Sequence, residues 1–199
     1  MERVQIEHGI YVYKNILPDS LSIIEELEDA VSKNFVQWIP SMVKTGDDVS
    51  ANAMIRDTDA IGVPYLGTIV EDDFTGVQDA LYKTLNNVFY EAFNPCEQDY
   101  KNIFGIATEW HDGWSLLKYG EGQFFKNHID DNTAYHRRIS TVYYMNDDYE
   151  GGEICFPRYG LKIKPEKHDL LIFPSFYTYN HEVLPVTKGT RYAVVGWLK

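Results

Sequence analysis

The chain has little of what marks secreted, membrane-spanning or disulfide-stabilised proteins. Among its 199 residues are only two cysteines, Cys96 and Cys155, which are too few for a disulfide framework but leave a single bridge open. No apolar run approaches the length of a membrane span, and residues 1–7 lack the apolar core of a signal peptide. These absences predict a cytoplasmic protein with no membrane partner.

Basic residues are also scarce. The chain carries 18 Lys and Arg against 30 Asp and Glu, a formal net charge of −12. A field of that sign repels phosphate backbones, so the sequence disfavours nucleic acid as a partner. The same charge also serves solubility alone, and composition does not separate the two roles. Aromatic residues are the excess, at 15% of the chain.

The chain contains no internal repeats, low-complexity tracts or linkers, and its length predicts one domain over residues 1–199. We expect residues 1–100 to form helical and flap support and residues 101–199 to form a β-rich core. Apolar residues at helical spacing predict a first helix through Leu21, Ile24, Leu27, Val31 and Phe35.

A second helix is predicted from Thr75, as its N-cap, to Asn94-Pro95, where the proline should end it. Residues 41–70 are rich in turn residues and predict irregular or short-stranded structure, which could form a mobile flap.

Short apolar runs separated by turn residues dominate the second half of the chain. The expected strands are 103–109, 114–119, 123–130, 138–146, 152–157, 161–164, 169–174, 180–185 and 190–198. Many short strands at this spacing predict an antiparallel sandwich or jelly roll, with the helices packed on one sheet. The expected fold class is therefore α+β, mainly β with N-terminal helices.

The tripeptide His128-Ile129-Asp130, followed 53 residues later by His181, carries the chemistry. Residues i and i+2 of a strand share a face, so His128 and Asp130 should point together while Ile129 packs away from them. His181 must then come from a strand that is distant in sequence and close in space. Two imidazoles and one carboxylate are the facial ligand set of non-haem Fe(II).

Zinc is the alternative to iron, because three ligands and a water also make a catalytic zinc site. Arg191, ten residues after His181, favours iron, because a dicarboxylate co-substrate explains an arginine there and a zinc hydrolase does not. The other histidines considered, His8, His111, His136 and His168, are expected to be structural, although His136 could line the cavity near the motif.

Several segments besides this motif resemble one enzyme family. The matching stretches are residues 116–123 (LLKYGEGQ), 138–146 (RISTVYYMN), 150–153 (EGGE), 156–157 (FP), 164–173 (KPEKHDLLIF) and the ending from His181 through Arg191 to Trp197. Together with the tripeptide they resemble the prolyl 4-hydroxylase branch of the 2-oxoglutarate/Fe(II) dioxygenases, over residues 114–199. The family has a glycine where this chain has His168, so that turn is expected to differ.

The resemblance implies a double-stranded β-helix (a cupin-like jelly roll) and a role for several residues. His128, Asp130 and His181 would ligate Fe(II). Arg191 would pair with the distal carboxylate of 2-oxoglutarate, with Tyr144 and Tyr119 also reaching the co-substrate. Arg138 and Trp197 would lie on the substrate side. O₂ is the second co-substrate, and ascorbate is the expected reductant.

The resemblance thus implies a procollagen-proline 4-dioxygenase-like enzyme that acts on proline-containing peptides or proteins. Two alternatives stay open. A hydroxylase of another protein residue or of a free amino acid would use the same metal site and differ in the substrate groove. A non-catalytic binding module could keep the fold, although it has no chemical need for the three ligands and Arg191. The sequence does not indicate an oligomeric state.

Overall fold

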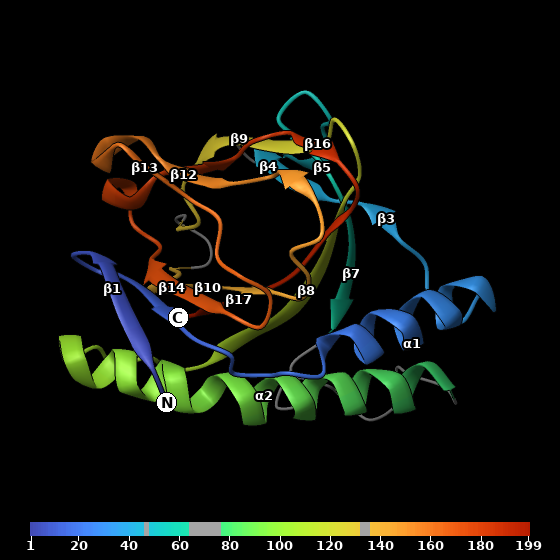
Figure 1. Ribbon diagram of the computed structural model, residues 1–199, viewed down its shortest axis with the longest axis horizontal. Coiled ribbons are helices and arrows are strands. Elements are labelled where there is room, and N and C mark those ends of the chain that lie inside the picture. The colour runs from blue at the N-terminus through green and yellow to red at the C-terminus, as the bar shows by residue number, and fades with distance from the viewer. Residues whose placement is uncertain (46–47, 64–76, 132–135) are drawn as a thin grey trace.

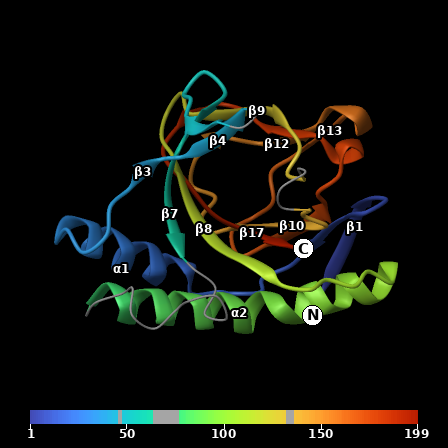
Figure 2. The same cartoon turned by 180° about the vertical axis from the view of Figure 1, so that it is seen from behind.

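Two antiparallel β-sheets face each other, and two helices cover the outer face of the larger sheet (Figures 1 and 2). In the computed structural model, residues 1–45, 48–63, 77–131 and 136–199 are described. The predicted N-cap Thr75 and part of the expected flap at residues 41–70 lie outside these ranges. The predicted fold class, a mainly β jelly roll with helices packed on one sheet, is confirmed.

The larger sheet has eight strands in the order β1-β2-β14-β10-β17-β8-β7-β3. Its strands are β1 (Arg3–Glu7), β2 (Ile10–Tyr13), β14 (Leu170–Pro174), β10 (Ile139–Tyr144), β17 (Arg191–Leu198), β8 (His111–Tyr119), β7 (Asp59–Val63) and β3 (Ile39–Pro40). The central strands are apolar on both faces, as a sheet covered on both sides requires. Half of the strands come from the first 63 residues, so the N-terminal region completes the sheet as well as supplying helices.

The smaller sheet has the order β13-β12-β15-β9-β6. Its strands are β13 (Leu161–Ile163), β12 (Ile154–Phe156), β15 (His181–Val183), β9 (Phe124–His128) and β6 (Arg56–Asp57). Two short ladders and two 3₁₀ turns complete the β region: β4 (Met42–Thr45) with β5 (Asp48–Ala51), β11 (Glu150–Gly151) with β16 (Val186–Lys188), η1 (Pro157–Tyr159) and η2 (Tyr177–Tyr179). Short strands within residues 41–70 agree with the sequence, whereas mobility of a flap there stays a prediction.

Helix α1 (Ser20–Ser32) forms where it was predicted, but with a different buried face. Leu21 is 49% exposed and Phe35 is 42% exposed, whereas Ile23 is buried. Ser20 is fully buried because its Oγ donates to the carbonyl of Met145 at 2.6 Å. The buried face of α1 therefore includes Ser20 and Ile23, and it is rotated by about one residue from the face that the sequence predicted.

Helix α2 (Val77–Phe104) passes straight through Pro95, so the prediction that Asn94-Pro95 ends it is wrong. Proline removes one backbone donor, but Phe93 and Tyr100, both fully buried, pack the helix against the sheet on either side of it. The helix ends instead at Gly105, whose φ of +63° suits a left-handed cap. The strand predicted over 103–109 is therefore absent, since those residues finish the helix and lead into β8.

Two cores lie on the two faces of the larger sheet. The helix-side core joins α1 and α2 to the sheet through residues such as Leu27, Phe93 and Trp114. The inter-sheet core lies between the two sheets and contains Tyr119 and Tyr144. Both cysteines are free thiols, so the single disulfide that the sequence allowed is not formed. Within the described ranges, neither helix has a stretch long and apolar enough to cross a bilayer.

Candidate metal centre and adjoining pocket

The structure brings His128, Asp130 and His181 together in the smaller sheet. Strands β9 and β15 pair antiparallel with His181 opposite His128, and the two ring centroids lie 4.3 Å apart. Asp130 follows two residues after the end of β9. One donor atom from each of the three residues lies within 4.8 Å of the others, close enough to share one ion. Both histidines come from neighbouring strands of the same sheet.

The two histidines present the same ring nitrogen to this space. His128 Nδ1 lies 2.8 Å from the Lys126 carbonyl and His181 Nδ1 lies 3.1 Å from the Tyr179 carbonyl. A carbonyl oxygen only accepts, so each Nδ1 carries the proton and each Nε2 keeps its lone pair. The two Nε2 atoms face the carboxylate of Asp130 at 3.5 and 3.7 Å, too far for good hydrogen bonds but suited to an ion between them.

Asp130 is held from the larger sheet. The Ser140 hydroxyl donates to its Oδ2 at 2.7 Å, and Ser140 is itself 2.8 Å from the hydroxyl of Ser175. Burial by itself would raise the pKa of Asp130, but His181, His128 and the Ser140 hydrogen bond hold that pKa well below its usual range. The carboxylate is therefore ionised and oriented before any ligand binds.

Aromatic side chains form the walls of this centre. Phe125 stacks on the His128 ring at 3.5 Å, and Phe173 meets the His181 ring edge-on at 4.8 Å. This burial, together with the nearby His128 ring, lowers the pKa of His181 to about 4, so its imidazole is neutral at neutral pH. The expectation that Ile129 packs away into apolar surroundings is wrong: Ile129 is 44% exposed, because β9 ends at His128 and the chain turns outward.

Arg191 opens β17 and lies in the inter-sheet core, opposite Tyr119 of β8 in the ladder. It is 1% exposed, and its guanidinium lies 4.8 Å from the ring centre of Tyr119 and 5.0 Å from that of Tyr144. The sequence predicted this trio, and the structure places the three residues side by side between the two sheets.

The buried cluster around Arg191 contains hydrogen-bonding groups that have no partner among the described residues. Arg191 Nε and Nη1 and the hydroxyls of Tyr144 and Tyr149 are buried, and none of them has a hydrogen-bond partner among the described residues. Leaving such donors unpaired costs about 1–3 kcal/mol each. A carboxylate has two oxygens that accept hydrogen bonds, so the chemistry of these donors suits an anionic co-substrate. Sequence reasoning missed Tyr149, for which no motif provided a signal.

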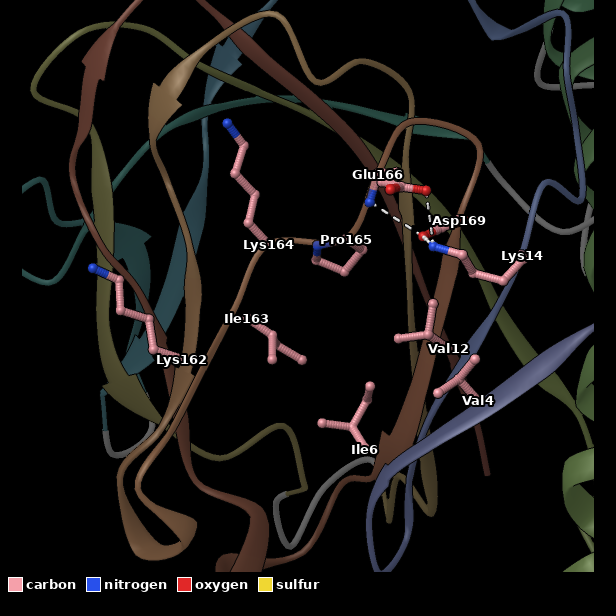
Figure 3. A pocket seen from close by; sticks show the side chains of 10 residues that line it. All are labelled: Val4, Ile6, Val12, Lys14, Lys162, Ile163, Lys164, Pro165, Glu166 and Asp169. Atoms are coloured by element: carbon pink, nitrogen blue, oxygen red, sulfur yellow. Dashed lines mark hydrogen bonds and ion pairs between the residues drawn. The ribbon is translucent and has the colours of Figure 1, made fainter.

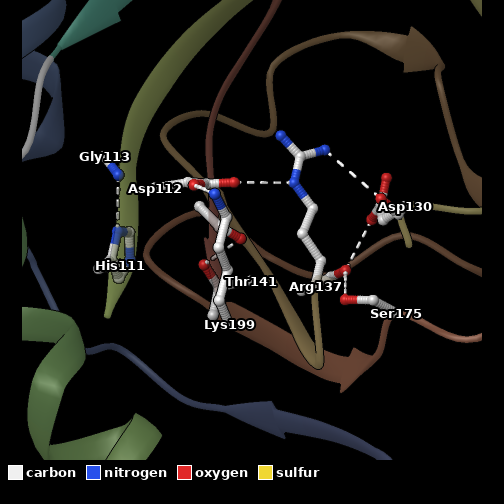
Figure 4. Close-up of polar contacts among 10 residues, drawn as sticks. His111, Asp112, Gly113, Asp130, Arg137, Thr141, Ser175 and Lys199 are labelled. Atoms are coloured by element: carbon white, nitrogen blue, oxygen red, sulfur yellow. Dashed lines mark hydrogen bonds and ion pairs between the residues drawn. The ribbon is translucent and has the colours of Figure 1, made fainter. Parts of the chain in front are cut away.

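Of the adjacent arginines, Arg137 is the one turned toward the centre. Arg138, which was expected on the substrate side, is exposed and donates to the Ala107 carbonyl at 3.2 Å. The Arg137 guanidinium lies 3.7 Å over the Trp197 ring and donates from Nε to Asp112 at 3.0 Å. Figure 4 shows it between Asp112 and Asp130. Both arginines lie just before β10, and the sequence alone did not fix which one faces inward.

Three of the remaining histidines make their contacts outside the metal centre. His111 packs on Trp114, with ring centroids 3.9 Å apart, and His8 meets Phe104 edge-on. His168 takes the place of the family's glycine at a φ of +73°, and its Nδ1 bonds to Ser20. His136 is exposed.

A separate hollow of about 380 Å³ opens between β1, β2 and β13 (Figure 3). Apolar side chains such as Ile6, Val12 and Ile163 line it, together with lysines that include Lys164. Neither the three candidate ligands nor Arg191 line it. The candidate centre is thus the space between the sheets and not this hollow.

Comparison with known proteins agrees with this geometry. Residues 114–199 match the model of the 2OG-Fe(II) oxygenase superfamily. A PKHD-type hydroxylase of Idiomarina loihiensis is 31% identical over 91 residues, which are 43% of this chain and 41% of that protein. The probable prolyl 4-hydroxylase 9 of Arabidopsis thaliana is 31% identical over 123 residues, 47% of this chain and 43% of that protein. The chain thus spans less than half the length of these relatives.

Among solved structures, a prolyl hydroxylase of Trichoplax adhaerens, in complex with a peptide fragment of hypoxia inducible factor, has the same fold. The TM-score is 0.69 at 21% identity, and the match covers 96% of this chain and 83% of that one. The resemblance to prolyl 4-hydroxylase-like 2-oxoglutarate/Fe(II) dioxygenases, expected from the sequence, is confirmed.

Proposed function

We propose, on the premise that residues 114–199 carry a 2OG-Fe(II) oxygenase core, that this chain is a 2-oxoglutarate- and Fe(II)-dependent hydroxylase of peptidyl proline. One observation supports it above the others. The same inter-sheet space holds three residues that could ligate one metal ion and a buried arginine with guanidinium donors that no described residue pairs. A metal site alone suits many reactions, whereas the pair suits an oxygenase that consumes a dicarboxylate.

The donor set fits iron. His128 and His181 would bind through Nε2 and Asp130 through its carboxylate, three ligands that leave further positions open for co-substrates. With Fe(II), 2-oxoglutarate and O₂ bound, the site would couple decarboxylation of 2-oxoglutarate to succinate and CO₂ with hydroxylation of a C–H bond. The protein's part is to fix the ligands: the carbonyls of Lys126 and Tyr179 hold the rings.

Arg191 and Tyr144 would bind the distal carboxylate of 2-oxoglutarate. A planar guanidinium offers two parallel N–H donors to a carboxylate, which a lysine cannot do. Tyr119 would contact the co-substrate from the neighbouring strand, where its ring already covers the guanidinium. Zinc would explain the ligand cluster and leave this arginine without a role, which favours iron.

A peptide substrate suits the outer side of the centre. Arg137, stacked on Trp197, lies between the metal ligands and the exposed surface, and we assign these two residues to the substrate side. Arg138, which the sequence favoured, extends toward Ala107, so its substrate role stays a proposal with less support. The net charge of −12 favours a neutral or basic peptide over nucleic acid.

The wider assignments rest on the same premise. We treat residues 1–199 as one catalytic domain, because the first 63 residues complete the larger sheet. We also propose a cytoplasmic location, which the two free thiols suit, and ascorbate as reductant, which the family resemblance implies. Hydroxylation of another residue or of a free amino acid is the alternative within the same class, and a non-catalytic binding module is the alternative outside it.

The test is succinate formation by anaerobically iron-loaded protein, given 2-oxoglutarate, O₂ and a panel of proline-containing peptides, with and without ascorbate. We expect peptide-dependent succinate and a +16 mass shift on proline. Slow succinate formation that does not depend on peptide would support oxygenase activity and show that none of the tested peptides is the substrate. No turnover by protein that binds iron would favour the binding module.

A further inference from the structure

Tyr149 is a buried residue beside Arg191 that no motif singles out. It precedes β11, belongs to the inter-sheet core and is 4% exposed. Its hydroxyl has no hydrogen-bond partner among the described residues. A buried phenol without a partner is costly, and a phenylalanine would fill the same space without that cost. The hydroxyl lies close enough to Arg191 to be affected by its charge but makes no well-formed hydrogen bond, so it has capacity for a ligand bound there.

The ring of Tyr149 and the stem of Arg191 converge on one glycine. A Cβ added at Gly152 would lie 3.1 Å from Tyr149 Cε2 and 3.2 Å from Arg191 Cδ, and Gly152 has a φ of +64°. Lys164 holds both the backbone and the ring of Tyr149. Its Nζ donates to the Tyr149 carbonyl and lies 4.0 Å from the centre of the Tyr149 ring. Tyr149 is thus held against the arginine by contacts that leave its hydroxyl unused.

The unused donors match one carboxylate. Tyr144 and Tyr149 offer one O–H each, and Arg191 offers the N–H groups of Nε and Nη1. An ionised carboxylate accepts about four hydrogen bonds on its two oxygens. Arg191 and Tyr144 leave some of that capacity unfilled, and the Tyr149 hydroxyl is the remaining unpartnered donor in the same cluster. Burial raises the pKa of Tyr149 against the opposing effect of Arg191, so its O–H stays protonated and able to donate.

We propose that Tyr149 is a third arm of the co-substrate pocket, donating its hydroxyl to the distal carboxylate of 2-oxoglutarate beside Arg191 and Tyr144. This inference rests on the proposed function. It makes the phenol a binding residue, so its hydroxyl contributes to affinity for ligands that carry a distal carboxylate and contributes nothing to affinity for ligands that lack one.

Calorimetric titration of Mn(II)-loaded protein tests this without turnover. Tyr149→Phe should bind 2-oxoglutarate about 10-fold or more weakly, because a hydrogen bond to a charged group contributes about 1.5–3 kcal/mol. The same variant should bind 2-oxopentanoate, which has a methyl group in place of the distal carboxylate, as the unchanged protein does. Its melting temperature without ligand should be equal or higher, since the lost hydroxyl has no partner.

Tyr143→Phe is the matched control. Tyr143 faces the helix side and donates to the Leu17 carbonyl at 2.6 Å, so its loss should lower the melting temperature and leave 2-oxoglutarate affinity unchanged. Equal affinity of the Tyr149→Phe and unchanged proteins for 2-oxoglutarate would overturn the inference, as would an equal loss for both ligands. If the unchanged protein binds Mn(II) but not 2-oxoglutarate, the proposed function fails instead.

Discussion

The two faces of the larger sheet are built from alternate residues of the same strands and bury different chemistry. Tyr143 and Tyr144 are neighbours in β10 and point to opposite faces. The Tyr143 hydroxyl donates to the Leu17 carbonyl, whereas the Tyr144 hydroxyl has no partner among the described residues. Phe89 and Phe93 stack at 5.5 Å on the helix side, while the other face contains Arg191.

This difference separates stability from function within one sheet. The helix-side core consists mainly of apolar and aromatic side chains, whose burial stabilises the fold. The inter-sheet core contains a guanidinium and two tyrosine hydroxyls that have no hydrogen-bond partner among the described residues, a cost that a bound ligand would offset. Changes on the helix side should therefore lower stability and spare binding, and changes between the sheets should do the opposite. Four substitutions test this separation of the two faces.

The largest effect is expected from Asp130→Ala. Removing one of three ligands should abolish hydroxylation and metal retention while the protein stays folded, because Asp130 contributes little apolar burial. Succinate assays and metal analysis after gel filtration measure both. The control is Asp29→Ala on the exposed surface of α1, which should keep full activity. Full activity of the Asp130 variant would refute the ligand assignment.

Phe93→Ala tests the other face. Phe93 is fully buried against Trp114 and Tyr143, each at a ring distance of 5.1 Å. Its loss should lower the free energy of unfolding by about 3–5 kcal/mol, as measured by urea denaturation. Phe35→Ala, at a 42% exposed site, should cost at most about 0.5 kcal/mol. The folded fraction of the Phe93 variant should bind 2-oxoglutarate normally, and weakened binding would contradict the separation of the two faces.

Arg191→Ala should raise the 2-oxoglutarate concentration needed for half-maximal turnover by on the order of 100-fold, because a carboxylate is left unpaired in a buried pocket. Arg191→Lys should recover only part of the loss, since a lysine cannot form the two-pronged contact. Arg158→Ala, at an exposed position in η1, is the control. An unchanged requirement in the Arg191→Ala variant would place the co-substrate elsewhere.

Ser140→Ala should have the smallest effect. It removes the hydrogen bond that orients Asp130 but no ligand, so metal affinity should fall by about 10-fold, with activity restored at higher metal concentration. Competition against a metallochromic chelator measures the affinity. Ser32→Ala, whose hydroxyl only bonds within α1, should leave it unchanged. Activity that excess metal does not restore would show that Ser140 acts through something other than Asp130.

Local patterns predicted much of the site and the fold class. The pairing of His128 with Asp130 is predictable because it depends on strand alternation over three residues, whereas His181 and Arg191 were added from the chemistry that a metal and a dicarboxylate require. Helix ends were less predictable. Pro95 is a strong local breaker, but the buried Phe93 and Tyr100 carry α2 past it to Gly105. Ser20, a polar residue, is buried through a bond to the distant Met145.

The order of residues along the chain specifies which groups are available: two imidazoles, a carboxylate, a guanidinium and alternating strands to display them. Which of these groups meet depends on the tertiary structure. It aligned His128 with His181 across β9 and β15, turned Arg137 rather than Arg138 toward Asp130, and set Tyr149 beside Arg191. Each of these three contacts depends on how far one segment is shifted along its neighbour and on which face a side chain occupies. A shift of one residue moves a side chain to the opposite face, and packing between distant segments decides the shift.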